Sequence, residues 1–497
     1  MQINTSLKTL DISYYQYTIQ DNDLPFGIGI TNFFGGPVIA KSLRQAFEAI
    51  VGPDHVMTAP EDLATYAYDA APLESVLPQA VLMPESSEEL GRIIKLCHEN
   101  RLPITVRGAG TNLSGGTIPD ADGVVILTAL LNRILEVNET DMYAVVQPGV
   151  ITAQLVTKVE AKGLFYPPDP GSQAVSTLGG NVMENAGGLR GLKYGVTRDY
   201  VMGLSFFDAM GNHIHTGSRT VKCATGYNIT QLMVGSEGTL GVLDEIVLKL
   251  IPYPAHRKSI ISMFKTIEDA SETVAGIIAG RIVPATLEIM DQFTIRAVEA
   301  FSKAGLPVDA GALLLIEVDG HPAQVEEDAA RVLDLCEKYG AYQTQTAEND
   351  AQREKIWAAR RSALSALAKL KPTLVLEDAT VPRSRIPDMV KGLGEIARKH
   401  GLDIGTFGHA GDGNLHPTIL TDRRDKTEWL RVEKAIEDIF AHALSLGGTL
   451  SGEHGIGIAK SAFLENEIGR ASVEFSKRLK RALDPSNILN PGKITGD

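Results

Sequence analysis

The chain has 497 residues and a formal net charge of −14, from 47 Lys and Arg against 61 Asp and Glu. This acidic balance argues against a nucleic-acid partner, which requires clustered cations. The length predicts about two to four domains, and 44% hydrophobic residues is typical of a globular protein rather than a disordered one.

Three cysteines, Cys97, Cys223 and Cys336, lie far apart in the sequence. They offer no disulfide framework, thiolate zinc site or Fe–S cluster held by this chain alone. The sequence contains no run of about 18 apolar residues that would predict a transmembrane segment, and its N-terminus lacks the pattern of a signal peptide. A reducing cytoplasm is the expected location, with peripheral membrane association through a partner as the alternative.

Residues 1–37 are interpreted as an N-terminal extension, because tyrosines lie among polar residues and glycines follow. From residue 38 the pattern is globular. Ser86 and Glu89 predict a capping box ahead of a helix with one apolar face. Residues 103–106 predict a strand that leads into a glycine cluster. Further short strands are predicted at 124–127, 144–146, 204–208 and 240–250.

The character of the sequence changes after residue 254. Before this point many glycines separate short strands. Beyond it, strands at 312–318 and 374–376 alternate with amphipathic helices at 323–338, 354–370 and 426–446. We therefore predict a glycine-rich domain over residues 38–254 and an α+β domain over residues 255–497.

Three glycine-rich segments indicate backbone lying against an extended ligand. The first, 107–116, follows a strand, but a GxGxxG motif from Gly108 needs a glycine where Leu113 stands, which disfavours a Rossmann fingerprint. Successive backbone N–H groups without side chains can still wrap an anionic phosphate. The second segment spans 167–188, and the third combines 226–228 with 235–241. One such segment alone would indicate tight turns, whereas three together favour a binding role.

A histidine pair in the second half of the chain has the spacing of a metal site. Residues 408–416 predict a strand, a Gly-Asp-Gly turn and a second strand, so a hairpin would bring His409 and His416 together. Downstream, Glu453 and His454 are adjacent in a glycine-flanked loop. Two histidines and one carboxylate form an open three-ligand site suited to Zn²⁺, Mn²⁺ or Fe²⁺. Each histidine alone could equally be structural, but their clustering favours function.

Arg360 falls within the apolar stripe of the helix predicted at 354–370, four residues from Ile356 and from Leu364. A guanidinium on a packed face is rarely left unpaired. One interpretation is an internal ion pair. The other is two-pronged capture of a substrate carboxylate.

These segments resemble the vanillyl-alcohol oxidase superfamily, and residues 42–493 resemble its D-2-hydroxyacid dehydrogenase branch. The resemblance implies an α+β fold with a two-part FAD-binding domain of the PCMH type. An α+β substrate domain follows, with C-terminal helices that return to the flavin domain. FAD would be bound without a covalent link, since the first glycine loop has no histidine. The residues implied to contact FAD are Arg107, Gly108, Gly110, Thr111, Asn112, Gly115, Gly116, Asp169, Ser172, Thr177, Gly179, Gly180, Asn181, Asn185, Gly187, Glu237, Gly238, Gly241 and Asn490.

The same resemblance assigns roles in the second domain. It implies that His409, His416 and Glu453 hold a divalent metal (Zn, Mn or Fe). It also implies that His454 is the catalytic base and that Arg360, in the family's Trp-x-x-Arg motif, binds the substrate carboxylate.

Relatives that act on D-2-hydroxyglutarate often carry a threonine one turn after this arginine and a lysine on the next strand. Here the corresponding regions read Leu364 and 374–378, which contain no additional cation for a second carboxylate. A monocarboxylic substrate such as lactate or glycolate is therefore favoured.

The implied activity is FAD- and metal-dependent oxidation of a small D-2-hydroxyacid, D-lactate first and glycolate next, to the 2-oxoacid. Electrons would pass to a separate acceptor: an electron-transferring flavoprotein, an Fe–S subunit or a quinone-linked partner. One alternative is an electron-transferring flavoprotein subunit of a glycolate or lactate oxidase complex with little activity alone. Another is an oxygen-using 2-hydroxyacid oxidase. A homodimer is a further expectation.

Overall fold

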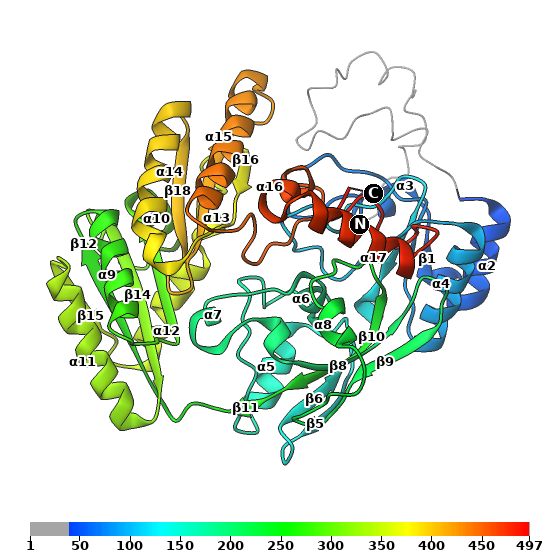
Figure 1. The fold of residues 1–497 in the computed structure, drawn as a ribbon, viewed down its shortest axis with the longest axis horizontal. Helices are drawn as coiled ribbons and strands as arrows, with labels where there is room; N and C mark the ends of the chain where they lie inside the picture. Colours follow the sequence, from blue (N-terminus) through cyan, green and yellow to red (C-terminus); the bar gives the residue numbers. More distant parts are fainter. Residues whose placement is uncertain (1–38, 497) are drawn as a thin grey trace, which may run out of the picture.

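The computed structural model describes residues 39–496 (Figure 1). The extension predicted at residues 1–37 lies outside the described residues. The chain first forms a four-stranded sheet in the order β1-β2-β4-β3, in which β4 is parallel to both β2 and β3. Its central strands are continuous apolar runs, as expected for a sheet that is buried on both faces. Its strands are β1 (Val56–Met57), β2 (Ala80–Leu82), β3 (Ile104–Arg107) and β4 (Val124–Leu127), packed with helices α2 (Lys41–Val51) and α4 (Ser87–Asn100).

A second, antiparallel sheet of five strands follows in the order β5-β6-β10-β8-β9. A separate core forms between this sheet and three helices, with Tyr166 at its centre. The strands are β5 (Ile134–Asn138), β6 (Tyr143–Val146), β8 (Val201–Phe207), β9 (His213–Gly217) and β10 (Val242–Lys249), and the helices are α5 (Thr152–Glu160), α6 (Leu178–Glu184) and α8 (Ile229–Met233). A short pair, β7 (Leu164–Phe165) with β11 (Ile251–Pro252), closes this part of the chain.

An eight-stranded sheet begins at β12, just beyond residue 254. Its strands are β12 (His256–Phe264), β13 (Thr286–Asp291), β14 (Ala312–Gly320), β15 (Gln343–Thr346), β16 (Thr373–Leu376), β17 (Ala379–Thr380), β18 (Asp403–His409) and β19 (Asn414–Thr421). Strand β14 is apolar on both sides: Leu314 and Ile316 enter one core, whereas Leu313 and Leu315 enter another. This alternation with a period of two requires helices on both faces of the sheet.

Two groups of helices meet that requirement. The first core packs against α9 (Ile267–Ala279), α11 (Pro322–Lys338), α14 (Ile386–His400) and α15 (Lys426–Ser445). The second packs against α10 (Gln292–Ser302), α12 (Asp350–Arg361) and α13 (Ala363–Leu367). No helix among the described residues is both long and apolar enough to cross a membrane.

The C-terminal segment returns to the first sheet. Helices α16 (Leu464–Ile468) and α17 (Arg470–Leu483) lie on the side of the molecule that carries the first two sheets in Figure 1. The chain then forms a parallel bridge between Leu489 and Ile104, in which Ile104 N donates to Ile488 O at 2.6 Å. The predicted return of the C-terminal helices is therefore confirmed.

Most predicted elements are observed with small shifts at their ends, but two details were wrong. The helix predicted at 354–370 is broken at Ser362, whose hydroxyl donates to Ala359 O at 2.7 Å; such local bonds compete with the helical ladder. The capping box is not reciprocal. Ser86 accepts from Glu89 N, but the Glu89 carboxylate accepts from Glu85 N at 2.7 Å rather than from Ser86 N.

We expect Asp484→Ala to destabilise the protein strongly by releasing the C-terminal segment. The buried Asp484 carboxylate accepts from Lys480 Nζ at 2.5 Å and from Ile488 N and Leu489 N at 3.1 and 2.8 Å. Its loss leaves a buried ammonium group without its counter-ion, which typically costs about 3–5 kcal/mol. Denaturant unfolding measures this change in the free energy of unfolding.

The control is Asp422→Ala, which breaks the exposed pair between Asp422 and Arg424. An exposed pair contributes about 0–1 kcal/mol. Equal denaturant concentrations at the midpoint of unfolding for the two variants would contradict the anchoring role of Asp484.

Candidate active site

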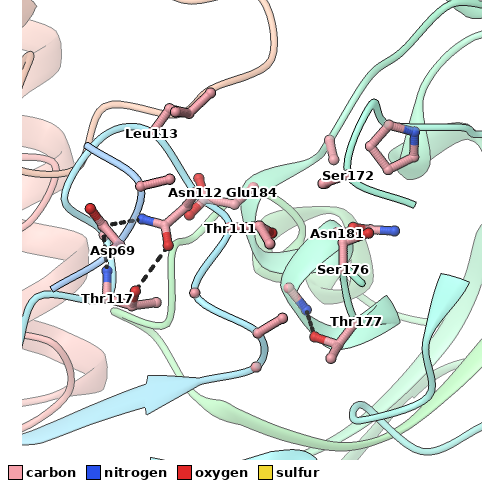
Figure 2. Close-up of a pocket in the computed structure, with 18 of the residues that line it drawn as sticks. Asp69, Thr111, Asn112, Leu113, Thr117, Ser172, Ser176, Thr177, Asn181 and Glu184 are labelled. Carbon is pink, nitrogen blue, oxygen red and sulfur yellow. Dashed lines mark hydrogen bonds between the residues drawn. The ribbon is translucent and has the colours of Figure 1, made fainter. Parts of the chain in front are cut away.

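A cavity of about 750 Å³ joins the glycine-rich loops of the first half of the chain to the histidine cluster of the second. Figure 2 shows the part of its wall that the first half supplies. This volume is within the usual range for cofactor and ligand sites. The residues predicted for metal binding and catalysis all line it: His409, His416, Glu453, His454 and Arg360. Most of those predicted for FAD line it as well: Arg107, Gly108, Gly110, Thr111, Asn112, Gly116, Ser172, Thr177, Gly179, Gly180, Asn181, Glu237, Gly238 and Gly241.

The first glycine loop is held from behind by polar contacts. Asn112 Nδ2 donates to Asp69 Oδ2 at 2.6 Å, and Thr117 Oγ1 donates to Asn112 Oδ1 at 2.9 Å (Figure 2). The Arg107 guanidinium is buried and donates to Tyr68 O at 2.5 Å. These bonds connect the loop to residues 68, 69 and 117.

Glycine is required at two positions of this wall. Gly110 has φ +67°, and a Cβ there would overlap the Arg107 guanidinium. Gly108 has no such φ, but a Cβ there would overlap the hydroxyl of Thr177, which caps α6 by accepting from Gly180 N at 3.2 Å. The first and second glycine segments therefore touch each other across the cavity wall.

Five residues predicted to contact FAD do not line the cavity: Gly115, Asp169, Asn185, Gly187 and Asn490. Asn490 supports the wall instead, because its Nδ2 donates to Gly116 O at 2.8 Å and to Glu237 O at 2.7 Å. Asp169 forms an ion pair with Arg190 at 3.5 Å, and burial raises the pKa of Asp169 to about 6. Asn185 ends α6 and accepts from Arg198 N.

The segment 226–228 was wrongly grouped with the ligand-facing glycines. It lies at the surface, where the Tyr227 side chain is 94% exposed, and it does not line the cavity.

The predicted hairpin brings the two histidines together. Strands β18 and β19 pair antiparallel, with Phe407 opposite His416 and His409 opposite Asn414. The His409 and His416 rings are 5.0 Å apart. Their Nε2 atoms lie 3.1 and 3.2 Å from the same atom, Glu453 Oε1. The two imidazole nitrogens therefore converge on one carboxylate oxygen.

The loop that carries Glu453 and His454 is held by two buried carboxylates. Asp378 Oδ2 accepts from the backbone N–H groups of residues 452, 453 and 454 at 2.7, 2.8 and 3.0 Å. Glu237 accepts from Ile456 N and Gly457 N, both at 2.7 Å. Asp378 belongs to the large sheet domain and Glu237 to the glycine-rich half, so the loop is fixed from both sides of the cavity.

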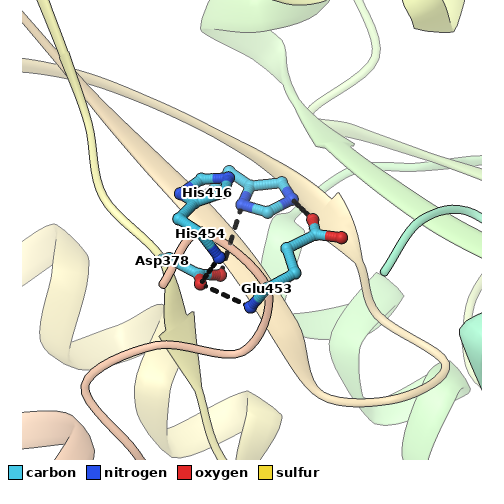
Figure 3. Close-up of side chains that lie close together, drawn as sticks. All are labelled: Asp378, His416, Glu453 and His454. Atoms are coloured by element: carbon cyan, nitrogen blue, oxygen red, sulfur yellow. Dashed lines mark hydrogen bonds and ion pairs between the residues drawn. The ribbon is translucent and has the colours of Figure 1, made fainter. Parts of the chain in front are cut away.

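His454 lies beside His416 in the same cluster. Its ring stacks on that of His416 at 5.2 Å and 14°, and Figure 3 shows the two rings beside Asp378 and Glu453. His454 Nδ1 has no hydrogen-bond partner. Burial lowers the pKa of His454 to about 4 despite the opposing field of Asp378. The neutral imidazole therefore faces the cavity as an acceptor.

Arg360 forms the internal ion pair that one of its two interpretations predicted. It is 6% exposed and forms an ion pair with Glu288, in which Nη2 and Oε2 are 2.5 Å apart but not aligned as a hydrogen bond. Its guanidinium also lies 4.7 Å from the Phe407 ring. Because Arg has five N–H donors and Nε has no partner, the ion pair leaves donors for a ligand.

Two site residues, Glu288 and Asp378, were missed. Glu288 accepts from His409 Nδ1 at 2.7 Å, and Asp378 holds the loop of Glu453. Each is a carboxylate next to a strand end or inside an apolar strand, where a charge is costly unless it is paired. A carboxylate in such a place can be noticed in the sequence, but the sequence does not show which residue it pairs with.

The donor set fits a divalent metal of the Zn, Mn or Fe class. His409 donates its Nδ1 proton to Glu288, because an ionised carboxylate can only accept, and this leaves Nε2 as the ligand atom. Asp378 belongs to a second grouping, with His416, Glu453 and His454 but without His409, in which the ligand atoms all lie within 4.8 Å of one another. However, its Oδ2 is occupied by backbone donors and its Oδ1 is 3.8 Å from His416 Nδ1. We therefore treat Asp378 as an orienting group rather than a ligand.

Two family models match the chain. "FAD binding domain" covers residues 78–217 and "FAD linked oxidases, C-terminal domain" covers residues 253–494. The glycolate oxidase subunit GlcD of Bacillus subtilis (strain 168) is 50% identical over 92% of this chain and 97% of its own length. The D-lactate dehydrogenase of Anaerostipes hadrus is 33% identical over 92% of this chain and 98% of its own.

Solved structures agree at the level of the fold. A p-cresol methylhydroxylase aligns with a TM-score of 0.77 at 19% identity, over 95% of this chain and 99% of its own. The 4-ethylphenol oxidase of Gulosibacter chungangensis aligns with a TM-score of 0.75 at 18% identity, over 95% of this chain and 98% of its own. The predicted PCMH-type architecture and FAD as cofactor are thereby confirmed. The chain belongs to the family of FAD-linked oxidoreductases that includes the glycolate oxidase subunit GlcD and D-lactate dehydrogenase.

Proposed function

We propose that the chain oxidises a small D-2-hydroxyacid to the 2-oxoacid, with D-lactate as the favoured substrate and glycolate next. The observation that carries this proposal is the single cavity that holds both the glycine-rich loops and the cluster of His409, His416, Glu453 and His454. A substrate bound at the cluster would be within the same enclosure as the flavin. The relatives named glycolate oxidase subunit and D-lactate dehydrogenase support the substrate class.

Each group of the cluster would have a distinct role. His409, His416 and Glu453 would hold a divalent metal, which when bound lowers the pKa of a coordinated hydroxyl. Arg360 would bind the substrate carboxylate, and His454 would take the hydroxyl proton as general base. FAD, bound without a covalent link, supplies the hydride acceptor.

The cavity wall beside Arg360 supports a short, monocarboxylic substrate. Leu364, Leu376 and Phe407 line the cavity there. A second carboxylate of a longer diacid would need its own cation, because an unpaired buried charge is costly. Two other arginines line the cavity, and both already have partners: Arg107 donates to Tyr68 O, and Arg361 is paired with Glu354. Neither is therefore a ready partner for a second carboxylate.

Electrons would leave through a separate acceptor, such as an electron-transferring flavoprotein, an Fe–S subunit or a quinone-linked partner. The name of the Bacillus subtilis relative, an oxidase subunit, supports a partner. The second candidate is a flavoprotein subunit with little activity outside its complex, which the same name favours.

We expect His409→Ala and His416→Ala to lose the metal and most turnover while retaining FAD, because the metal ligands and the glycine loops belong to different segments. Elemental analysis and flavin absorbance of the purified variants measure both quantities. His256→Ala, an exposed histidine of the same domain, is the control and should keep metal and activity. Stoichiometric metal in either ligand variant would show that the ligand assignment is wrong.

Arg360→Lys should lower kcat/KM for D-lactate, because Lys cannot make a two-pronged contact with a carboxylate. Loss of a charge-assisted pair costs about 1.5–3 kcal/mol, or roughly ten- to a hundredfold in kcat/KM. Steady-state kinetics with an artificial dye measure kcat/KM. The control is Arg331→Lys on the surface of α11. A lowered melting temperature with normal kinetics would mean that Arg360 serves only as an internal ion pair.

Oxygen should react slowly compared with an artificial dye if a partner is the true acceptor. The measurement is hydrogen peroxide formation during aerobic D-lactate oxidation, set against the rate of dye reduction. Peroxide formed as fast as dye is reduced would identify the chain as an oxidase and remove the reason to propose a partner.

A further inference from the structure

We propose that Glu288 is a positioning residue that couples the substrate-binding arginine, Arg360, to the metal-binding histidine, His409. The inference rests on the proposed function, because it assigns Glu288 a role between two groups that function uses. The Glu288 carboxylate contacts both groups, with one oxygen on each.

The register of the sheet places Glu288 at this point. Strands β13 and β18 are antiparallel, with Ile289 opposite Gly408, so the next pair along brings Glu288 beside His409. The Glu288 side chain is fully buried. Its Oε1 lies 2.7 Å from His409 Nδ1, and its Oε2 lies 2.5 Å from Arg360 Nη2.

Both contacts require an ionised carboxylate. A histidine Nδ1–H and a guanidinium can only donate towards Glu288, and a carboxylate has two acceptor oxygens, one for each. Accepting the Nδ1 proton fixes the orientation of the imidazole with Nε2 towards Glu453.

An isosteric amide cannot replace this carboxylate. Glutamine has one acceptor oxygen and one donor amide group. If the oxygen faces His409, the amide N–H groups face the guanidinium; if it faces Arg360, they face the Nδ1 proton. Glu288→Gln therefore breaks one contact in either orientation while it preserves the volume of the side chain.

The rival interpretation is that Glu288 only neutralises a buried cation and has no influence on the metal. Glu317 provides the matched control for it. Glu317 is also a buried carboxylate, on the neighbouring strand β14, and accepts from Ser259 Oγ at 2.6 Å and Trp357 Nε1 at 3.2 Å. It does not line the cavity. Glu317→Gln therefore reports the cost of removing a buried charge from the same sheet.

The test uses the full chain with FAD, stripped of metal, in native, Glu288→Gln and Glu317→Gln forms. The Kd for Zn²⁺ is measured by competition with a chelating dye, independently of turnover. The KM and kcat for D-lactate are measured after Zn²⁺ is restored at saturation. We expect Glu288→Gln to weaken Zn²⁺ binding about 10- to 100-fold, the usual effect of losing a group that orients a metal ligand. KM should rise in the same variant, and Glu317→Gln should change neither Kd nor KM.

A second variant covers the case in which Glu288→Gln does not fold. Arg360→Lys leaves all three metal ligands in place, yet the coupling predicts that its Zn²⁺ affinity falls about fivefold or more. An unchanged Zn²⁺ Kd in folded Glu288→Gln, or in Arg360→Lys when the first variant is unfolded, would overturn the inference while the proposed function stands. If the native chain binds no stoichiometric metal, both the metal role in the proposed function and this inference are wrong.

Discussion

The loop of residues 451–457 is clamped by two buried carboxylates, and the chemistry of the site depends on this constraint. Asp378, from the large sheet, holds the backbone of residues 452–454, and Glu237, from the glycine-rich half, holds residues 456 and 457. Between these anchors the chain has little freedom to move Glu453 and His454. A carboxylate that accepts several N–H bonds is strongly stabilised as an anion, and the fields of His454 and Lys460 further lower the pKa of Asp378 against the effect of burial.

The clamp also explains how two separately folded halves share one site. The glycine loops gain their shape from contacts within the first half, such as Asp69 with Asn112. The histidine pair gains its shape from the β18–β19 hairpin. The loop at 451–457 contacts both halves, and the C-terminal segment adds a third link through Asn490, which bonds the two glycine walls at Gly116 and Glu237. A rigid enclosure of this kind orients reactants without reorganisation.

Sequence reasoning predicted the parts of the site that local spacing determines. His409 and His416 stand on either side of a short turn, so their approach follows from the hairpin alone. The family resemblance then named Glu453, His454 and Arg360. Reasoning from spacing could not find Glu288, because it is 121 residues from His409 in sequence and meets it only through the pairing of β13 with β18. The partner of Arg360 was missed for the same reason. The exposed position of Tyr227 depends equally on tertiary packing, since a glycine pattern does not distinguish a cavity wall from a surface loop.

We propose that one chain carries a complete reductive half-reaction, in which the metal cluster activates the substrate next to the flavin. Anaerobic stopped-flow mixing with D-lactate tests it most directly, with flavin bleaching recorded for the native chain, the metal-stripped chain and the chain after Zn²⁺ or Mn²⁺ is restored. The account predicts rapid bleaching of the native chain, slow bleaching after stripping and recovery on restoration. Equal bleaching with and without metal would contradict the role of the cluster, and bleaching that requires an added partner subunit would contradict the self-sufficiency of the chain.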